Sequence, residues 1–265
     1  MELSRHLIAI LNAITFVLSI PILGAGIWLA GRHHTDCIRF LQGPVIVIGL
    51  FVMLSSIAGF AGSYLRIRWL LWIYLAVMFL LIVLLFCFTV FSFSVTNKGA
   101  GEALSGKGYK DYKLGDYSTW LQRKVRSSNN WNPIKSCIKD AHICESLGKY
   151  KIASDFYEAE LSSVQSGCCK PPTACSFLFI NATYWTRPLN VDADPDCYRY
   201  SYVQSELCFD CDSCKAGVVD KVRHDWRKVA AVNIVIFFLL IVVYSAGCHS
   251  FRRSHEEGSY AKGII

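Results

Sequence analysis

Long apolar stretches without a charged residue alternate with polar segments along the chain. They cover residues 7–30, 44–65, 69–94 and 229–248. Each is about 20 residues or longer, which lets a helix cross a hydrocarbon core of roughly 30 Å. The first stretch continues through Trp28 without the small-residue cleavage site of a signal peptide, so we expect it to be retained. The pattern predicts four transmembrane helices.

The basic residues of the short polar segments predict the orientation of these helices. Segments 1–6, 66–68 and 249–265 carry Arg5, Arg66, Arg68, Arg252, Arg253 and Lys262. The short loop 31–43 carries only Arg32 and Arg39. Because cytosolic loops are enriched in Lys and Arg, we expect both termini and the 66–68 turn to be cytosolic. The small loop 31–43 and the large loop 95–228 then face outward, and 249–265 is a polar tail without predicted structure.

Three segments of the large loop show a helical spacing of apolar residues. They are 116–125, 134–147, which follows Pro133 as a first-turn residue, and 154–164, for which Ser154 is the expected N-cap. The large loop is therefore expected to be mainly helical.

Two other segments of the large loop lack that spacing. The glycine-rich stretch 97–109 predicts a flexible exit from the third span. Segment 168–212, rich in Pro, Cys, Tyr and Asp, predicts irregular structure. As loops held on a scaffold often carry recognition, residues 175–212 are the expected contact region.

An apolar helical spacing returns after Cys214, at Val218, Val222 and Trp226. The next residues, RKVAAVNIV, contain no helix breaker. We expect one helix to run from the large loop into the fourth span; the alternative is two helices with a kink near His224.

Ten of the twelve cysteines fall in the outward-facing loops. An outward compartment is oxidising, so these residues predict a disulfide framework. They are Cys37 in the small loop and Cys137, Cys144, Cys168, Cys169, Cys175, Cys197, Cys208, Cys211 and Cys214 in the large loop. The large loop alone has an odd number, so either Cys37 joins one of them or one thiol stays free.

The spacing Cys208-x-x-Cys211-x-x-Cys214 also permits a metal-binding or thiol-redox alternative. A ferredoxin-type site would need a further cysteine before a proline, and KAGVV follows instead. A reactive Cys-x-x-Cys redox pair is expected next to a βαβ unit, and the sequence predicts no such unit. The disulfide interpretation is favoured.

No other motif predicts chemistry. His33, His34 and Asp36 cluster in the small loop, but adjacent histidines do not share a helix face. Paired carboxylates, a nucleophile elbow and a phosphate loop are missing. The net charge of +7 forms no one-sided patch for nucleic acid. We therefore expect no catalytic, cofactor or metal residues, no cofactor and no small-molecule substrate.

Within the predicted spans, Asn12 and Asn233 are the only carboxamides, and no Asp, Glu, Lys or Arg occurs. An amide in hydrocarbon seeks a partner, either across the first and fourth helices or on another protein. Small residues in the first two spans, such as Gly26 and Gly59, let helix backbones approach closely, for internal packing or for partner docking. An ion pathway is not supported.

Two positions match modification signals. Asn181-Ala-Thr183 is an N-glycosylation sequon. Cys248, at the cytosolic end of the fourth span, is a candidate for palmitoylation. Cys87, nearer the outer leaflet, is expected to be a buried small hydrophobe.

Four spans, a small loop and a large loop with the stretch Gly167-Cys168-Cys169-Lys170-Pro171-Pro172 resemble the tetraspanin family over the whole chain. This form of the motif, a cysteine in the small loop and the opening HLIAILNAITFVLSIPILGAGIW resemble the plant branch. The resemblance implies an all-α membrane protein: four transmembrane helices with a large disulfide-stapled, mainly helical extracellular loop. It implies that one of the adjacent cysteines pairs with Cys214, a closure of more than 40 residues worth roughly 3–4 kcal/mol.

The family resemblance also implies a function. Its members are non-enzymatic organisers that recruit other membrane proteins and other tetraspanins into microdomains, in contact with membrane lipids. A multi-pass protein of the plasma membrane, active in plant cell differentiation, development or senescence-associated signalling, is the expectation. Many animal members carry several cysteines at the cytosolic membrane edge, whereas this chain has Cys248 there.

Overall fold

The computed structural model describes residues 2–31, 36–64, 68–96, 101–186 and 188–262. They form two compact units. The helical unit comprises residues 1–34, 38–91 and 230–265, and the loop unit comprises 35–37 and 92–229.

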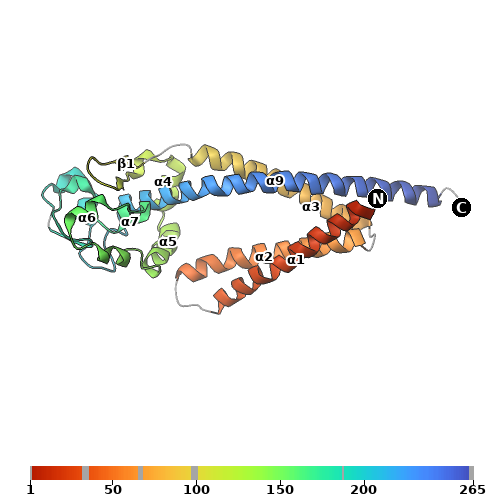
Figure 1. Ribbon diagram of the computed structural model, residues 1–265, viewed down its shortest axis with the longest axis horizontal. Coiled ribbons are helices and arrows are strands. Elements are labelled where there is room, and N and C mark those ends of the chain that lie inside the picture. The colour runs from red at the N-terminus through yellow and green to blue at the C-terminus, as the bar shows by residue number, and fades with distance from the viewer. Residues whose placement is uncertain (1, 32–35, 65–67, 97–100, 187, 263–265) are drawn as a thin grey trace. The chain divides into compact units, whose positions relative to one another are not determined.

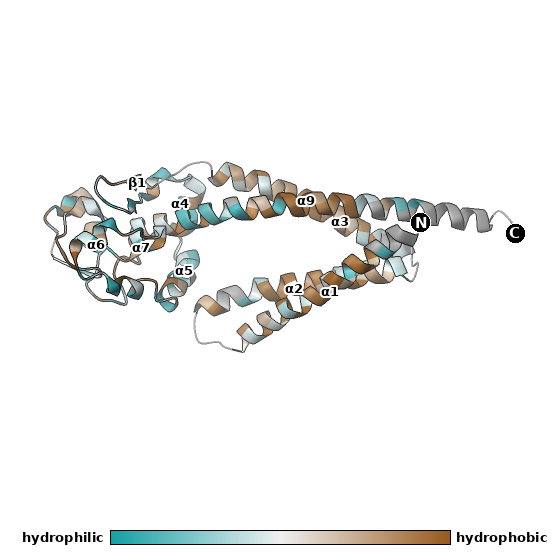
Figure 2. Cartoon of the chain, in the orientation of Figure 1, coloured by the Kyte–Doolittle hydropathy of each residue, from teal (hydrophilic) through white to brown (hydrophobic). Residues whose placement is uncertain are grey.

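Among the described residues, four helices are long and apolar enough to cross a membrane. They are α1 (Glu2–Ala30), α2 (Asp36–Tyr64), α3 (Arg68–Thr96) and α9 (Asp212–Lys262). Figure 2 shows hydrophobic residues concentrated along α1, α2, α3 and the middle of α9. The prediction of four spans is confirmed. The helices extend beyond the predicted spans, since α2 already begins within the small loop and α1 begins at Glu2.

The side-chain amide of Asn12, in the first span, finds its hydrogen-bond partners inside the helical unit. Asn12 is buried, and its Nδ2 donates to the Ile8 carbonyl at 2.8 Å and to the Tyr74 hydroxyl at 3.3 Å. Its partner on another helix is therefore Tyr74 of α3 rather than Asn233 of α9, which is half-buried.

Small residues of the first two spans make room for close contacts between helices. A Cβ on Gly59 would collide with Asn12 and Tyr74, so the absence of a side chain at Gly59 leaves space for their hydrogen bond. Gly26 likewise faces Ile46. These two small residues serve internal packing.

α9 continues without interruption from Asp212 to Lys262 (Figure 1). The prediction of one helix running from the large loop into the fourth span is confirmed, and the kink near His224 is wrong. The helix also covers most of the predicted tail, which was expected to be unstructured. Residues 251–262 contain no proline, and their Glu, Ala and Lys residues favour a helix, which continues through Gly258.

The loop unit is built from short helices and two small antiparallel hairpins among its described residues. Its elements are β1 (Glu102–Ala103), β2 (Lys110–Asp111), η1 (Leu114–Asp116), α4 (Thr119–Arg126), α5 (Ser128–Asp140), η2 (Glu145–Lys149), α6 (Ala153–Glu158), α7 (Ser163–Cys168), η3 (Thr173–Cys175), β3 (Phe179–Asn181), β4 (Tyr184–Trp185), η4 (Val191–Ala193) and α8 (Asp196–Arg199). β1 pairs with β2, and β3 pairs with β4.

An aromatic cluster forms the core of the loop unit. Phe156 is fully buried, with ring centroids of Phe179 at 5.3 Å, of Tyr109 at 5.7 Å and of Trp185 at 5.7 Å. These rings come from α6, β3, β4 and the segment before β2. The core thus joins segments that are far apart in the sequence.

The glycine-rich stretch is more ordered than expected from residue 101 onward, while 97–100 lie outside the described residues. Gly106 turns the chain with φ +71° between β1 and β2. A Cβ on Gly108 would collide with the Glu158 carbonyl group, so this glycine lets the strand approach α6. Burial of Tyr109 then fixes the segment.

The helix predicted over 134–147 has different bounds in the structure. α5 begins at Ser128, before Pro133, because Trp131 is buried and its indole donates to the Phe209 carbonyl at 3.1 Å. α5 ends at Asp140 because His142 has a φ of +48°.

The segment 154–164 divides into α6 and α7, and the expected N-cap at Ser154 is wrong. Ile152 precedes α6, and Ser162 caps α7. Ser162 Oγ accepts the Gln165 N–H, and the Gln165 side chain accepts the Ser162 N–H. The spacing Ser-x-x-Gln was a signal for this capping box.

Candidate functional site

Five disulfides join all ten cysteines of the two predicted outward loops. The pairs are Cys37–Cys137, Cys144–Cys169, Cys168–Cys214, Cys175–Cys197 and Cys208–Cys211. Cys37 thus balances the odd number in the large loop. The adjacent Cys168 and Cys169 bond to different partners, and Cys168–Cys214 is the closure that the family resemblance implied.

These disulfides include all three cysteines of the metal-binding or thiol-redox alternative, Cys208, Cys211 and Cys214. Cys208 pairs with Cys211, Cys214 pairs with Cys168, and all four side chains are fully buried. In this state none of them offers a thiolate to a metal ion. The described residues contain no group of three His, Cys, Asp or Glu placed to hold one. Of the small-loop cluster, His33 and His34 lie outside the described residues, and Asp36 begins α2.

Glycines bring α7 and α9 into backbone contact beside the Cys168–Cys214 bond. The Cα atoms of this disulfide are 4.2 Å apart. A Cβ on Gly167 would collide with the Ser213 carbonyl oxygen, and one on Gly217 with that of Ser163. The glycine of the GCCK stretch is therefore required by the close approach of the two helices.

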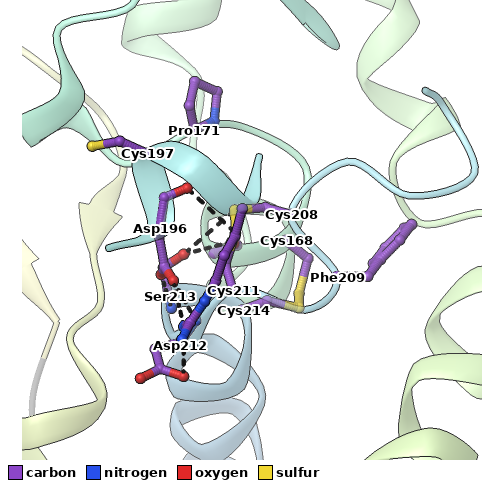
Figure 3. The surroundings of a disulfide bond; sticks show 12 residues. Cys168, Pro171, Asp196, Cys197, Cys208, Phe209, Cys211, Asp212, Ser213 and Cys214 are labelled. Carbon is purple, nitrogen blue, oxygen red and sulfur yellow. Dashed lines mark hydrogen bonds and ion pairs between the residues drawn. A yellow bond between two sulfur atoms is a disulfide. The ribbon is translucent and has the colours of Figure 1, made fainter. Parts of the chain in front are cut away.

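A buried carboxylate caps the beginning of α9 (Figure 3). Asp196 accepts the backbone N–H of Asp212 at 2.9 Å and that of Ser213 at 2.7 Å. Arg199 donates to the same carboxylate at 3.1 Å. The first N–H groups of a helix lack intrahelical partners and carry partial positive charge, so a buried anion is stabilising there. Asp196 comes from α8, which ties the irregular segment to the start of the long helix.

The buried lysine of the GCCK stretch holds a second carboxylate, which is partly buried. Lys170 Nζ donates to Asp111 Oδ1 at 2.7 Å and lies 4.8 Å from the Tyr109 ring centroid. The Thr173 backbone N–H donates to Asp111 Oδ2 at 3.2 Å. Burial raises the pKa of Asp111, but the charge of Lys170 and these hydrogen bonds outweigh it and lower the pKa below its ordinary value. The pair joins β2 to the segment after α7.

A pocket of about 240 Å³ lies beside these two carboxylates. Lys170, Arg126, Asp111 and Asp212 are among its charged lining residues. They pair with one another, Lys170 with Asp111 and Arg126 with Asp212 at 3.4 Å. The charges of the pocket therefore tie segments of the loop unit together.

The irregular segment carries the two large hydrophobic residues with the highest exposed fractions among the described residues of the loop unit. Leu189 is 73% exposed and Tyr198 is 68% exposed. Leu189 lies shortly before η4, and Tyr198 lies in α8. The Cys175–Cys197 disulfide bonds α8 to η3, and the hydrogen bond between Asp196 and the Ser213 N–H joins α8 to the beginning of α9. These side chains are presented on a scaffold of fixed bonds.

The remaining predicted positions are spread over the chain. Asn181 is exposed at the end of β3. Cys248 is a free, half-buried cysteine of α9, and Cys87 is a free cysteine exposed on α3, contrary to the expected burial. Asn233 lies on α9, and its side chain makes no hydrogen bond among the described residues.

Sequence reasoning missed Asp111 and Asp196 as structural anchors. Each has an acidic side chain in a polar, apparently exposed stretch, and its partners are distant in sequence. Pro171 follows Lys170, which is the partner of Asp111, and Pro195 precedes Asp196. Neither proline, nor any local spacing of residues, identifies the contacts that the two carboxylates make. These roles emerge only from the tertiary structure.

Comparison with known proteins gives a consistent result over the whole chain. The Tetraspanin family model matches residues 4–250. Tetraspanin-8 of Arabidopsis thaliana is 52% identical over 263 residues, covering 98% of this chain and 96% of the relative. Tetraspanin-7 of the same organism is 47% identical over 260 residues, covering 97% and 98%. Protein TORNADO 2, also from Arabidopsis thaliana, is 44% identical over 263 residues, covering 99% and 98%. No solved structure matches the chain.

Proposed function

The chain belongs to the tetraspanin family, and on that premise we propose that it is a membrane organiser that recruits other membrane proteins and other tetraspanins into microdomains. It is a multi-pass membrane protein. Members of the family are generally non-enzymatic scaffolds, and we propose the same for this chain.

The proposed orientation places segments 1–6, 66–68 and 249–265 in the cytosol and the loop unit outside the plasma membrane. The basic residues of the short segments support this orientation. The disulfides support it independently, because such bonds form and persist in an oxidising compartment. Cys248 then lies at the cytosolic membrane edge, where we propose that it is palmitoylated.

The observation that carries the proposal is the exposure of Leu189 and Tyr198 on a cross-linked scaffold. Large aromatic and aliphatic side chains that are exposed on a protein surface favour protein contacts. We propose that residues 175–212 contain the contact surface for partner membrane proteins. We also propose participation in plant cell differentiation, development or senescence-associated signalling, because the family resemblance implies it; the relatives named above are all from Arabidopsis thaliana.

Proximity labelling in living cells tests this proposal. The full chain is compared with Leu189→Ser/Tyr198→Ser and with Ile152→Ser, which changes a side chain 61% exposed elsewhere on the loop unit. The full chain should label a reproducible set of membrane proteins, which the double variant loses and Ile152→Ser keeps. A set equal to that of an unrelated four-span protein at the same abundance would contradict it.

A further inference from the structure

The hairpin of β3 and β4 turns a glycosylation sequon outward by means of a β-bulge. Phe179 pairs with Trp185 and Asn181 pairs with Tyr184, with a shift of register between the two pairs. In a regular strand Asn181 would face the same side as Phe179, which packs in the core. The bulge interrupts this alternation. As a result Phe179 and Trp185 face inward, while Asn181 and Tyr184 are exposed.

An exposed pair of aromatic rings lies beside Asn181. Tyr184 is directly opposite Asn181 across the hairpin, where side chains of facing residues are neighbours. Its ring is 46% exposed, and the ring centroid of Tyr202, which is 40% exposed, lies 5.7 Å away. Tyr202 is held by its hydroxyl, which donates to the Thr186 carbonyl at 3.3 Å, and by the buried ring of Tyr200 at 5.6 Å. The two rings form a fixed, partly uncovered apolar surface.

The acceptor amide is held in a defined turn. Asn181 Oδ1 accepts the Thr183 backbone N–H at 3.1 Å. The Thr183 carbonyl in turn accepts from the Tyr200 hydroxyl at 3.3 Å and from Gln204 Nε2 at 3.2 Å. Asn181 Nδ2, the atom to which glycans are attached, makes no hydrogen bond among the described residues.

We propose that an N-glycan on Asn181 packs its first N-acetylglucosamine against the Tyr184–Tyr202 ring pair and stabilises the loop unit. Glycosylation forms a bond between Nδ2 and the anomeric carbon, breaks that carbon's bond to a lipid-linked diphosphate donor and releases one amide proton. The C–H-rich face of a pyranose suits the face of an aromatic ring, which is electron-rich. The sugar is tethered to the residue opposite Tyr184, so the contact is intramolecular.

The proposal divides the exposed surface of the irregular segment. The glycan covers the hairpin side, and Leu189 and Tyr198 remain for protein partners. It rests on the outward orientation of the loop unit in the proposed function, because the glycan donor and its transferase act on the outward side.

Trimming the glycan isolates the effect of its first sugar. The full-length protein is produced with oligomannose glycans and purified, and a portion is digested with an endoglycosidase that leaves a single N-acetylglucosamine on asparagine. We expect both forms to unfold at the same midpoint temperature. Thr183→Ala and Asn181→Gln, which remove the glycan in two different ways, should both lower the midpoint by roughly 2–4 °C.

A coupled variant shows whether the ring pair is the sugar's partner. In Tyr184→Ser, the difference in midpoint between the form with one sugar and the unglycosylated form should disappear. Tyr198→Ser is the matched control, because Tyr198 is an exposed tyrosine of the same unit and its hydroxyl instead contacts Asp192. There the difference should persist. Equal differences in the two backgrounds would overturn the proposal and leave the rings open to a protein partner.

Occupancy separates this proposal from the orientation on which it rests. Asp192→Thr adds a second acceptor, at Asn190, in the same segment. A glycan on Asn190 but not on Asn181 overturns the glycan contact alone. Absence of sugar from both positions overturns the contact and the outward orientation together.

Discussion

The carboxylate of Asp196 accepts a 2.7 Å hydrogen bond from the backbone N–H of Ser213, so a side chain of the irregular segment caps the helix that continues as the fourth span. The neighbouring Cys168–Cys214 disulfide bonds the first turn of the same helix to α7. A hydrogen-bonded cap and a disulfide therefore both join the beginning of α9 to other segments of the loop unit. These bonds hold the proposed contact surface for partner proteins on a defined support.

Replacing Asp196 with Ala should destabilise the loop unit by about 2 kcal/mol, because it removes the helix cap and leaves buried N–H groups unsatisfied. Thermal or denaturant unfolding of the purified full chain measures this loss. Asp192→Asn, at an exposed carboxylate nearby, should change stability by less than about 0.5 kcal/mol. Equal losses in the two variants would contradict the capping role.

Gly167→Ala and Gly217→Ala should each prevent the close approach of α7 and α9. A Cβ at either position meets a backbone carbonyl that cannot move aside easily. We expect a loss of more than about 2 kcal/mol and a larger fraction of protein with Cys168 and Cys214 unpaired. The controls are Gly115→Ala and Gly148→Ala, since a Cβ at those positions meets nothing within 4 Å. Alkylation of free thiols after folding measures the outcome.

The Lys170–Asp111 pair predicts a pH dependence with a defined sign. The pKa of Asp111 is lowered, so its stabilising effect is complete above the unfolded value of about 3.9 and is lost as the pH falls through the lower folded value. In Lys170→Met the partly buried carboxylate of Asp111 loses its charged partner, and desolvation then acts to raise its pKa. We expect a loss of about 3 kcal/mol near pH 7, which shrinks as the pH approaches about 4.

Unfolding of wild type and Lys170→Met across this pH range tests the pair. Lys113→Met is the control, because Lys113 pairs with Glu102 on the surface and should cost less than about 0.5 kcal/mol. A loss in Lys170→Met that does not vary with pH would show that Lys170 contributes packing alone.

Asn12→Ala should weaken the helical unit more than Asn233→Ala. Asn12 is buried and bonds to Tyr74, whereas Asn233 is half-buried without a partner among the described residues. Interhelical hydrogen bonds in membranes average about 0.6 kcal/mol, so the expected difference is of that order. The resistance of the helical unit to denaturing detergent measures it, and a larger effect at Asn233 would point to a contact outside this chain.

The four spans and the disulfide framework were predictable because they depend on properties written locally in the sequence. Long uncharged stretches identify the helices without any knowledge of packing. Cysteines in an outward loop predict disulfides, and the family resemblance placed Cys168 or Cys169 opposite Cys214. The unbroken α9 followed from the absence of a helix breaker between Val218 and the span.

The helix boundaries and the buried ion pairs were not predictable, because tertiary contacts decide them. Burial of Trp131 starts α5 ahead of Pro133, although a proline inside a helix removes one hydrogen bond. Lys170 and Asp196 have no local signal, because their partners are Asp111 and the backbone of Ser213. The β-bulge before Asn181 is equally hidden, since it depends on how β3 packs against Phe156.

The count of free thiols in the purified, unreduced protein tests the central claim most directly. The account predicts that alkylation without reduction modifies at most Cys87 and Cys248, or Cys87 alone if Cys248 is lipidated. The other ten cysteines should react only after reduction. Labelling of four or more cysteines, with some among Cys208, Cys211 and Cys214, would contradict the cross-linked outward loop and reopen the metal or thiol-redox alternative.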